Sequence, residues 1–281
     1  MFDYGREGYE TTKKLLEEAG IEWFGAEGKV VKVENNGCRL AFSGWCCYST
    51  NPQGCVKNGA YGLNEFDVDE AVKILKRNAD EGWLNIVAIH AGIEHVNYPS
   101  IDTIKVSEIL AKMGPMIYYG HHPHVAQPVE RKGESLVAYS LGNFCFDDTY
   151  ARKDDKKPFL KLSEANRESF ILIVTIENNE ISNYEIVPIY IGKQGIEIGR
   201  GVTHETLDGW LNQMYTMDTK DFEHMRREQR NVWVKERRAK RGMRWLLSHL
   251  RPRYLHLMVT NYLNARKYDT HIRKYIQTNG L

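Results

Sequence analysis

The apolar and polar positions of residues 1–203 follow two alternating rhythms. Apolar side chains recur at helical spacing in three segments: residues 7–19, 67–80 and 101–112. Short apolar runs typical of buried strands occur at three places: residues 85–90, 116–119 and 135–140. Strands that alternate with helices predict crossover units in a parallel sheet.

Two further pairs of strand-like runs flank tight turns. One pair covers residues 30–45 around Asn-Asn-Gly at 35–37, and the other covers 169–191 around Asn-Asn-Glu at 178–180. Asn and Gly tolerate the positive φ that a tight turn requires, so both segments predict antiparallel hairpins. Crossover units mixed with hairpins indicate an α/β fold.

The pattern changes after residue 203, where strand-like runs stop. We therefore divide the chain into an α/β domain at 1–203 and a basic helical extension at 204–281. Residues 221–281 carry 15 Lys and Arg against 5 Asp and Glu, which leaves 23 basic and 32 acidic residues elsewhere. Such a segment suits an anionic polymer, an anionic lipid surface or nucleic acid. We favour the alternative, in which the segment is a solvated helical face that packs its aromatic side chains on the acidic remainder of the chain. No nucleic-acid motif is present in the sequence.

Composition narrows the class of protein. With 42% hydrophobic and 27% charged residues, the chain has the profile of a soluble globular protein. It contains no run of about 18 apolar residues, and its charged opening does not resemble a signal peptide. For the chain as written we expect a cytoplasmic protein without a transmembrane segment. The five cysteines form no C-x-x-C pair, so we expect reduced, mostly buried thiols.

Polar residues with metal-binding or catalytic potential cluster where the predicted strands end. They are His90, Glu94, His121, His122, His124 and Asn143. Strand ends in α/β sheets are where sites are usually built. Imidazole is a good ligand for Zn, Mn or Fe, and an H-x-H pair can offer one ring to each of two ions. The pattern therefore indicates a divalent transition-metal site.

Each of these residues also has a purely structural interpretation. A single histidine after a strand is often only a hydrogen-bonded residue, which leaves the role of His90 open. Clustering favours ligation by His122 and His124. Glu94 could be a solvated loop carboxylate, and Asn143 could simply close a turn.

Three stretches carry a resemblance to a known family. They are HAGIEHVNYPS at 90–100, GHHPHVAQPVE at 120–130 and VAYSLGNFCFD at 137–147. In order and with compatible spacing, they resemble the H-x-G-x-E-x-x-x-x-P-S, G-x-H-P-H-V-x-Q-P-x-E and Y-S-L-G-N-F-x-F-D stretches of the CapA family, associated with poly-γ-glutamate capsule synthesis. That family is related to calcineurin-like metallophosphoesterases. Over roughly residues 1–195, the resemblance implies a layered α-β-β-α sandwich with a dinuclear metal site between strand-end loops.

The resemblance also implies roles for individual residues. The metal ligands would be His90, His122 and His124, which match the histidines of the family motifs. Glu94 and Asn143 would line the site as catalytic residues. They match the carboxylate and the amide of the same motifs.

The sequence departs from the family pattern at Ala91, where the family often has an aromatic residue, and at its start. His121 occupies a variable position, so it is a weaker ligand candidate. The opening MFDYGREGYETTKKLLEEAGIEWFGA resembles the family segment that comes directly after its N-N-H motif. We therefore expect the carboxylate ligands and a proton-donating histidine to be missing, and the sandwich and its metal site to be incomplete. A second copy or a complementary N-terminal chain would then be needed, and an extracellular, membrane-anchored location would apply if such a part precedes this chain.

Together these inferences predict a metal-dependent, phosphoesterase-like hydrolase in bacterial capsule, exopolysaccharide or poly-γ-glutamate synthesis. Its substrate would be an anionic polymer or a phosphoester, and its activity would depend on ligands from outside the chain. The alternative is a catalytically inactive accessory protein that keeps the fold and binds polymer or a partner.

Overall fold

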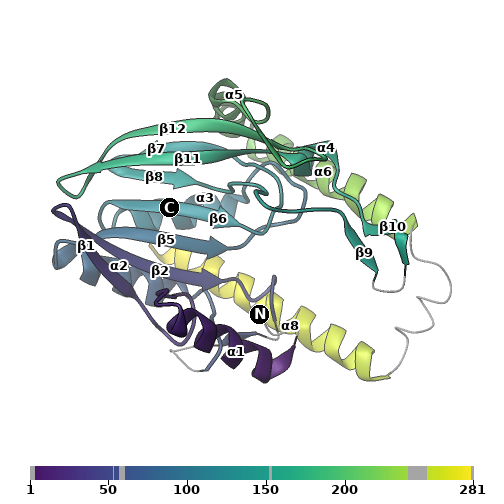
Figure 1. Ribbon diagram of the computed structural model, residues 1–281, viewed down its shortest axis with the longest axis horizontal. Coiled ribbons are helices and arrows are strands. Elements are labelled where there is room, and N and C mark those ends of the chain that lie inside the picture. Colours follow the sequence, from purple (N-terminus) through teal and green to yellow (C-terminus); the bar gives the residue numbers. More distant parts are fainter. Residues whose placement is uncertain (1–3, 53, 57–60, 152–153, 240–251, 280–281) are drawn as a thin grey trace.

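A six-stranded sheet forms the centre of the protein, as a computed structural model shows (Figure 1). The structure describes residues 4–52, 54–56, 61–151, 154–239 and 252–279. The strands follow the order β1-β2-β5-β6-β8-β7. Their bounds are Val31–Asn35 for β1, Cys38–Cys46 for β2, Leu84–His90 for β5, Met116–His121 for β6, Ser135–Ala138 for β8 and Val129–Lys132 for β7.

The inner strands β2, β5, β6 and β8 run parallel, and β1 and β7 are antiparallel edge strands. The register pairs Cys46 with His90, and His90 with His121. Three parallel strands therefore end side by side at one edge of the sheet. This alignment brings the predicted site residues of separate motifs to the same place.

Helices cover one face of this sheet. They are α2 (Val68–Asp80), α3 (Ile101–Ala111) and α8 (Pro252–Thr278). Between them lies a buried core to which β5 contributes Val87 and Ile89, α2 contributes Leu75, and α8 contributes Ile272. Alternate residues of a buried strand face opposite layers, so Ile86 of the same strand belongs to the second core on the other face.

A three-stranded antiparallel sheet packs on that other face (Figure 1). It consists of β11 (Glu168–Glu177), β12 (Glu180–Ile191) and β13 (Ile196–Ile198). Phe170 and Ile181 of this sheet share the second core with Leu136 of β8. The predicted layered α/β architecture is confirmed, including both hairpins, β1–β2 and β11–β12.

Shorter elements complete the part that precedes residue 203. They are α1 (Gly5–Glu18), β3 (Cys55–Val56), β4 (Leu63–Asn64), β9 (Thr149–Ala151), β10 (Asp154–Leu160) and α4 (Glu164–Arg167). The strands β9 and β10 pair with one another, as do β3 and β4. None of these four strands was predicted from the hydrophobic pattern.

The extension is helical over its described residues, as predicted. Its helices are α5 (His204–Thr216), α6 (Thr219–Ala239) and α8. They share the core of the sheet, because Phe222, Tyr268 and Ile276 are each less than 10% exposed within it. Because both parts contribute to one core, the division at residue 203 describes a change in the sequence pattern. That it separates two domains stays a prediction. Within the described residues, no helix is long and apolar enough to cross a membrane.

Candidate metal and substrate site

The ends of β5 and β6 bring two of the predicted ligands together. His90 Nε2 lies 3.2 Å from His122 Nδ1, and the ring centroids are 4.9 Å apart. We call these two residues the histidine pair. The backbone at His122 has a φ of 99°, a conformation that is strained for a residue with a side chain. Strain of this kind occurs where the surrounding structure holds a side chain in place.

The close approach at this edge depends on Gly120. A Cβ atom there would lie 1.9 Å from the carbonyl oxygen of Tyr139, so no larger residue fits. The backbone N–H of Leu141 donates to the Gly120 carbonyl at 3.2 Å. The glycine therefore allows the segment that carries Asn143 to dock against β6 beside the histidines.

The spacing of the histidine pair fits a bound transition metal. Two imidazoles on one tetrahedral ion with metal–nitrogen bonds of 2.0–2.1 Å have nitrogens about 3.3 Å apart. The observed separation of 3.2 Å between His122 Nδ1 and His90 Nε2 is close to that value. The two nitrogens share a hydrogen bond in the structure, and a bound ion would take the place of its proton.

Burial keeps both rings uncharged at neutral pH. Desolvation, followed by the neighbouring histidines, lowers the pKa of His90 to about 4. Desolvation and His124 lower the pKa of His122 to about 4 as well. Only a neutral imidazole has a lone pair for a metal, so this environment favours ligation.

His124 lies beside the pair and is oriented by Asn143. Its Nδ1 is 2.8 Å from Asn143 Oδ1, and its ring centroid lies 6.4 Å from that of His122. The Asn143 amide nitrogen donates to the carbonyls of Asn166, at 3.0 Å, and His124, at 3.3 Å. Asn143 Oδ1 must then accept, which places the proton of His124 on Nδ1 and leaves the Nε2 lone pair free. Asn143 therefore acts on His124 as residues behind metal ligands do.

His121, the weaker ligand candidate, lies opposite His90 in the sheet and makes a different ring contact. Its ring packs edge-on against Tyr119, with centroids 5.4 Å apart. Burial lowers the pKa of His121 too. The next residue in the chain, His122, lines a large cavity.

This cavity, of about 920 Å³, opens next to the histidine pair. His122 and the loop 91–94, which includes Glu94, form one side of it. Helices α6 and α8 contribute other lining residues, among them Arg230, Trp233 and Tyr268. A cavity of this size accommodates a small-molecule substrate or a segment of a polymer.

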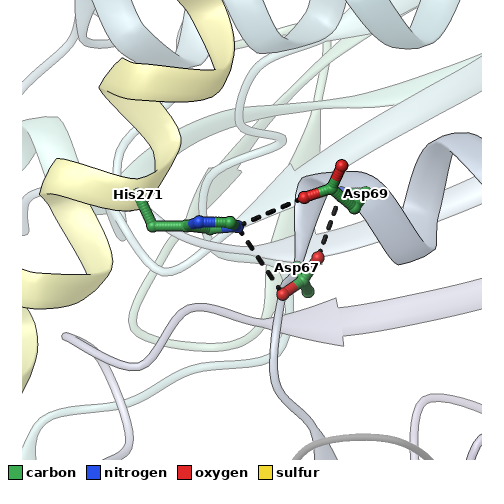
Figure 2. Close-up of side chains that lie close together, drawn as sticks. All are labelled: Asp67, Asp69 and His271. Carbon is green, nitrogen blue, oxygen red and sulfur yellow. Dashed lines mark hydrogen bonds and ion pairs between the residues drawn. The ribbon is translucent and has the colours of Figure 1, made fainter.

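A second group of possible metal ligands lies elsewhere, and sequence reasoning missed it. Among the described residues, Asp67, Asp69 and His271 are the group of three whose ligand atoms all lie within 4.8 Å of one another (Figure 2). We call it the Asp-Asp-His cluster. His271 Nε2 is 3.7 Å from Asp67 Oδ2 and 3.4 Å from Asp69 Oδ2. The two aspartates are close in sequence, but nothing in the sequence connects them with a histidine on the last helix.

The Asp-Asp-His cluster already has structural roles. Asp67 caps α2, because its Oδ1 accepts from the backbone N–H groups of Asp69, at 3.0 Å, and Glu70, at 3.2 Å. His271 lies on α8, and its contacts with the two aspartates connect this helix to the start of α2. The cluster could hold a cation, and it also serves as a contact between two helices.

All five cysteines are free, as predicted. Cys46 and Cys47 are buried, but Cys38 and Cys55 are half-buried and Cys145 is exposed. The expectation that most are buried is therefore wrong. A hydrogen bond with Cys55 lowers the pKa of Cys46, which ends β2 opposite His90, to about 7.

Comparison with known proteins connects this site to one family. The profile of the family described as "Bacterial capsule synthesis protein PGA_cap" matches residues 1–148. The chain is 32% identical over 167 residues to the capsule biosynthesis protein CapA of Bacillus anthracis, covering 55% of this chain and 40% of that protein. It is 26% identical over 196 residues to the PGA biosynthesis protein CapA of Bacillus subtilis (strain 168), covering 67% and 48%. The matches thus span less than half the length of either relative.

Proposed function

The chain belongs to the family of bacterial capsule synthesis proteins PGA_cap, and from this premise we propose that it is a metal-dependent, phosphoesterase-like hydrolase of capsule or poly-γ-glutamate synthesis. Both relatives carry names that refer to capsule or PGA biosynthesis. The proposal extends that process to this chain and adds a chemical activity. Its substrate would be a phosphoester or an amide of an anionic polymer.

The histidine pair is the observation that carries the proposal. Its nitrogens have the 3.2 Å spacing of two ligands on one ion, and both rings are neutral at physiological pH. Mn, Zn or Fe would be held by His90 and His122, with His124 as a third ligand after a movement of its ring. Such an ion supplies a Lewis acid that polarises the bond to be broken.

The chain's own residues would perform the remaining tasks. Asn143 fixes the tautomer of His124, so that the Nε2 lone pair is available. Glu94 lines the cavity beside His122 and is our choice for the residue that exchanges a proton with the substrate. A substrate in the cavity would lie beside Glu94 and His122.

A second candidate function, the non-catalytic accessory protein, is favoured by one observation. In the part of the chain that the structure describes, no carboxylate or third histidine completes a three-ligand group around the histidine pair. Phosphoesterase sites that hold two ions need bridging ligands. In an accessory protein the same cavity would bind polymer or a partner chain without chemistry.

Metal analysis together with hydrolysis assays separates the two functions. The purified protein is loaded with Mn or Zn, desalted, and analysed by elemental mass spectrometry. Bis(4-nitrophenyl) phosphate and a γ-linked glutamate oligomer are then tested as substrates. We expect about one ion per chain and turnover of one substrate, both lost in the His122→Ala variant. A folded protein with bound metal and no turnover of either substrate would favour the accessory function.

A further inference from the structure

Helix α6 of the extension forms a wall of the cavity beside the histidine pair. Its residues Arg226, Arg230 and Trp233 line this cavity together with His122 and Glu94. All of α6 lies outside residues 1–148, which the family profile matches. Its contribution to the cavity is therefore a feature of this chain's own extension.

Three contacts hold α6 in place against the segment that follows Glu94. The Trp233 indole stacks on the ring of His95, with centroids 5.0 Å apart and an interplanar angle of 28°. Gln229 Oε1 accepts from the backbone N–H of Asn97 at 3.0 Å, although the two residues are 132 positions apart. Arg226 Nε donates to the carbonyl of Tyr98 at 3.3 Å. A helix fixed at three successive points positions its other side chains reproducibly.

The contacts of Trp233 also connect α6 with the histidines. His95 Nδ1 lies 3.0 Å from the amide nitrogen of Asn166, and the same nitrogen donates to the carbonyl of His124 at 2.8 Å. A ring stack and two hydrogen bonds of Asn166 thus connect the cavity wall with the candidate ligand His124. A ligand that touches Trp233 lies against the same framework that orients His124.

Two of the three guanidinium groups that line the cavity are already paired. Arg226 donates to both carboxylate oxygens of Glu223, at 2.7 and 2.9 Å. Arg273 of α8 donates to Asp102 at 2.9 Å. The first pair lies within α6, the second connects α8 to α3, and each offsets the charge of its arginine.

Arg230 differs from the other two arginines. Across the ranges that the structure describes, no hydrogen bond or ion pair engages its guanidinium, although it lines the cavity. An arginine presents a rigid set of five donors that matches carboxylate and phosphate oxygens. Glu94 and Asp269 also bring carboxylates to the lining, so an anionic group is best accommodated at Arg230 and away from them.

We propose that Arg230 binds an oxyanion of the substrate, a carboxylate or a phosphate, while Trp233 provides the apolar wall against which the rest of the substrate packs. This inference rests on the proposed function, because it takes the cavity beside the histidine pair as the substrate site. It makes the basic extension a part of that site. One of the positive charges of residues 221–281, that of Arg230, then serves substrate recognition.

The test compares Arg230→Gln with Arg227→Gln in the full chain. Arg227 is an exposed arginine of the same helix that does not line the cavity, so both variants remove the same charge from α6. Binding of inorganic phosphate and of a γ-linked glutamate pentapeptide is measured by calorimetry at low salt. The protein is first treated with EDTA, so that the result does not depend on a metal. Circular dichroism checks that each variant is folded.

We expect Arg230→Gln to raise the Kd of at least one probe by about tenfold or more, as the loss of a charge-assisted hydrogen bond does. Arg227→Gln should change it by less than about twofold, since exposed charges are screened. An effect on phosphate alone identifies a phosphate group as the ligand, and an effect on the pentapeptide alone identifies a carboxylate. Trp233→Leu should weaken the pentapeptide and leave phosphate unchanged.

Equal effects of the two arginine variants, or no saturable binding of either probe, would overturn the inference. The hydrolase function is tested separately, and it is refuted if the protein binds no metal or turns over neither substrate. Turnover with an unchanged KM in Arg230→Gln would refute the role of Arg230 and leave the hydrolase intact. Loss of probe binding in Arg230→Gln but not in Arg227→Gln, in a protein without turnover, would support the role of Arg230 and refute the hydrolase function.

Discussion

The histidine pair and the Asp-Asp-His cluster are two groups of possible metal ligands that differ in ligand type and in electrostatic setting. His90 and His122 are desolvated, with each pKa lowered to about 4, and His122 lines a large cavity. In the cluster, two carboxylates face His271, whose side chain is 45% exposed, and one of them caps α2. The cluster gathers more ligand atoms within a short distance, but one of its carboxylates is already engaged as the cap of α2.

The comparison shows that proximity of ligands alone does not define a metal site. A carboxylate that caps a helix and faces a histidine loses favourable contacts when it turns toward an ion. A neutral imidazole beside another neutral imidazole has no ion pair to break when it binds a metal. Desolvation already favours the neutral form of the ring, so no proton has to be removed from an imidazolium first. We therefore propose the histidine pair, rather than the cluster, as the site of a functional metal, and a structural role for the cluster.

The largest expected effect comes from removing the pair itself. The double variant His90→Ala/His122→Ala should lower zinc affinity by more than about 100-fold, since even residues behind the ligands change affinity by 10- to 100-fold. Competition with a fluorescent zinc chelator measures this change. His121→Ala is the matched control, because its ring packs on Tyr119, and it should keep most of the affinity. Affinity retained in the double variant would refute the assignment.

A smaller effect is expected at Asn143. Asn143→Ala removes the acceptor that keeps the proton of His124 on Nδ1, so the lone pair is no longer held on Nε2. We expect a loss in zinc affinity of about tenfold. The same chelator competition applies, with the exposed Asn231→Ala as the control. If His124 makes no contribution, both variants will bind zinc like the wild type.

The pH dependence of stability should also separate the two regions. The histidines of the pair have a pKa of about 4 in the folded state, against about 6.5 in the unfolded chain. The unfolded state then binds more protons between these values, so metal-free protein should lose stability as pH falls from about 6.5 to about 4. Urea unfolding in EDTA at several pH values measures the loss. It should be smaller in His90→Gln/His122→Asn, and that difference would attribute the pH dependence to the histidine pair.

The smallest effect is expected at the cluster. Asp67→Ala removes the N-cap of α2 and should cost about 1 kcal/mol of the free energy of unfolding. Zinc affinity should stay within about twofold of the wild type. Urea unfolding and chelator competition on the same preparation measure both quantities. A large loss of affinity with little change in stability would reverse the roles that we assign to the two regions.

The sequence predicted the main layers of the fold because their signals are local. The turn at 35–37 and the apolar run at 85–90 each determine their conformation within a few residues, and β1–β2 and β5 are found there. The strands β9 and β10 were missed, since their three and seven residues lack a clear apolar pattern. Strands of that kind depend on tertiary pairing.

The candidate site was predictable only in part, for the same reason. Three histidines within four positions, at 121, 122 and 124, mark the end of β6 in the sequence itself. The contacts of α6 could not be predicted, because Trp233 and His95 are far apart in the chain and meet only through the packing of the extension. The contact of His271 with the start of α2 could not be predicted either, because the residues involved are far apart in the chain. Residues brought together by folding leave no local pattern.

Anomalous diffraction from a crystal of the zinc-loaded protein, with data above and below the zinc edge, tests the central assignment most directly. The account predicts the strongest peak between His122 Nδ1 and His90 Nε2, about 2.0–2.1 Å from each nitrogen. A strongest peak at Asp67, Asp69 and His271, with none at the histidine pair, would contradict it.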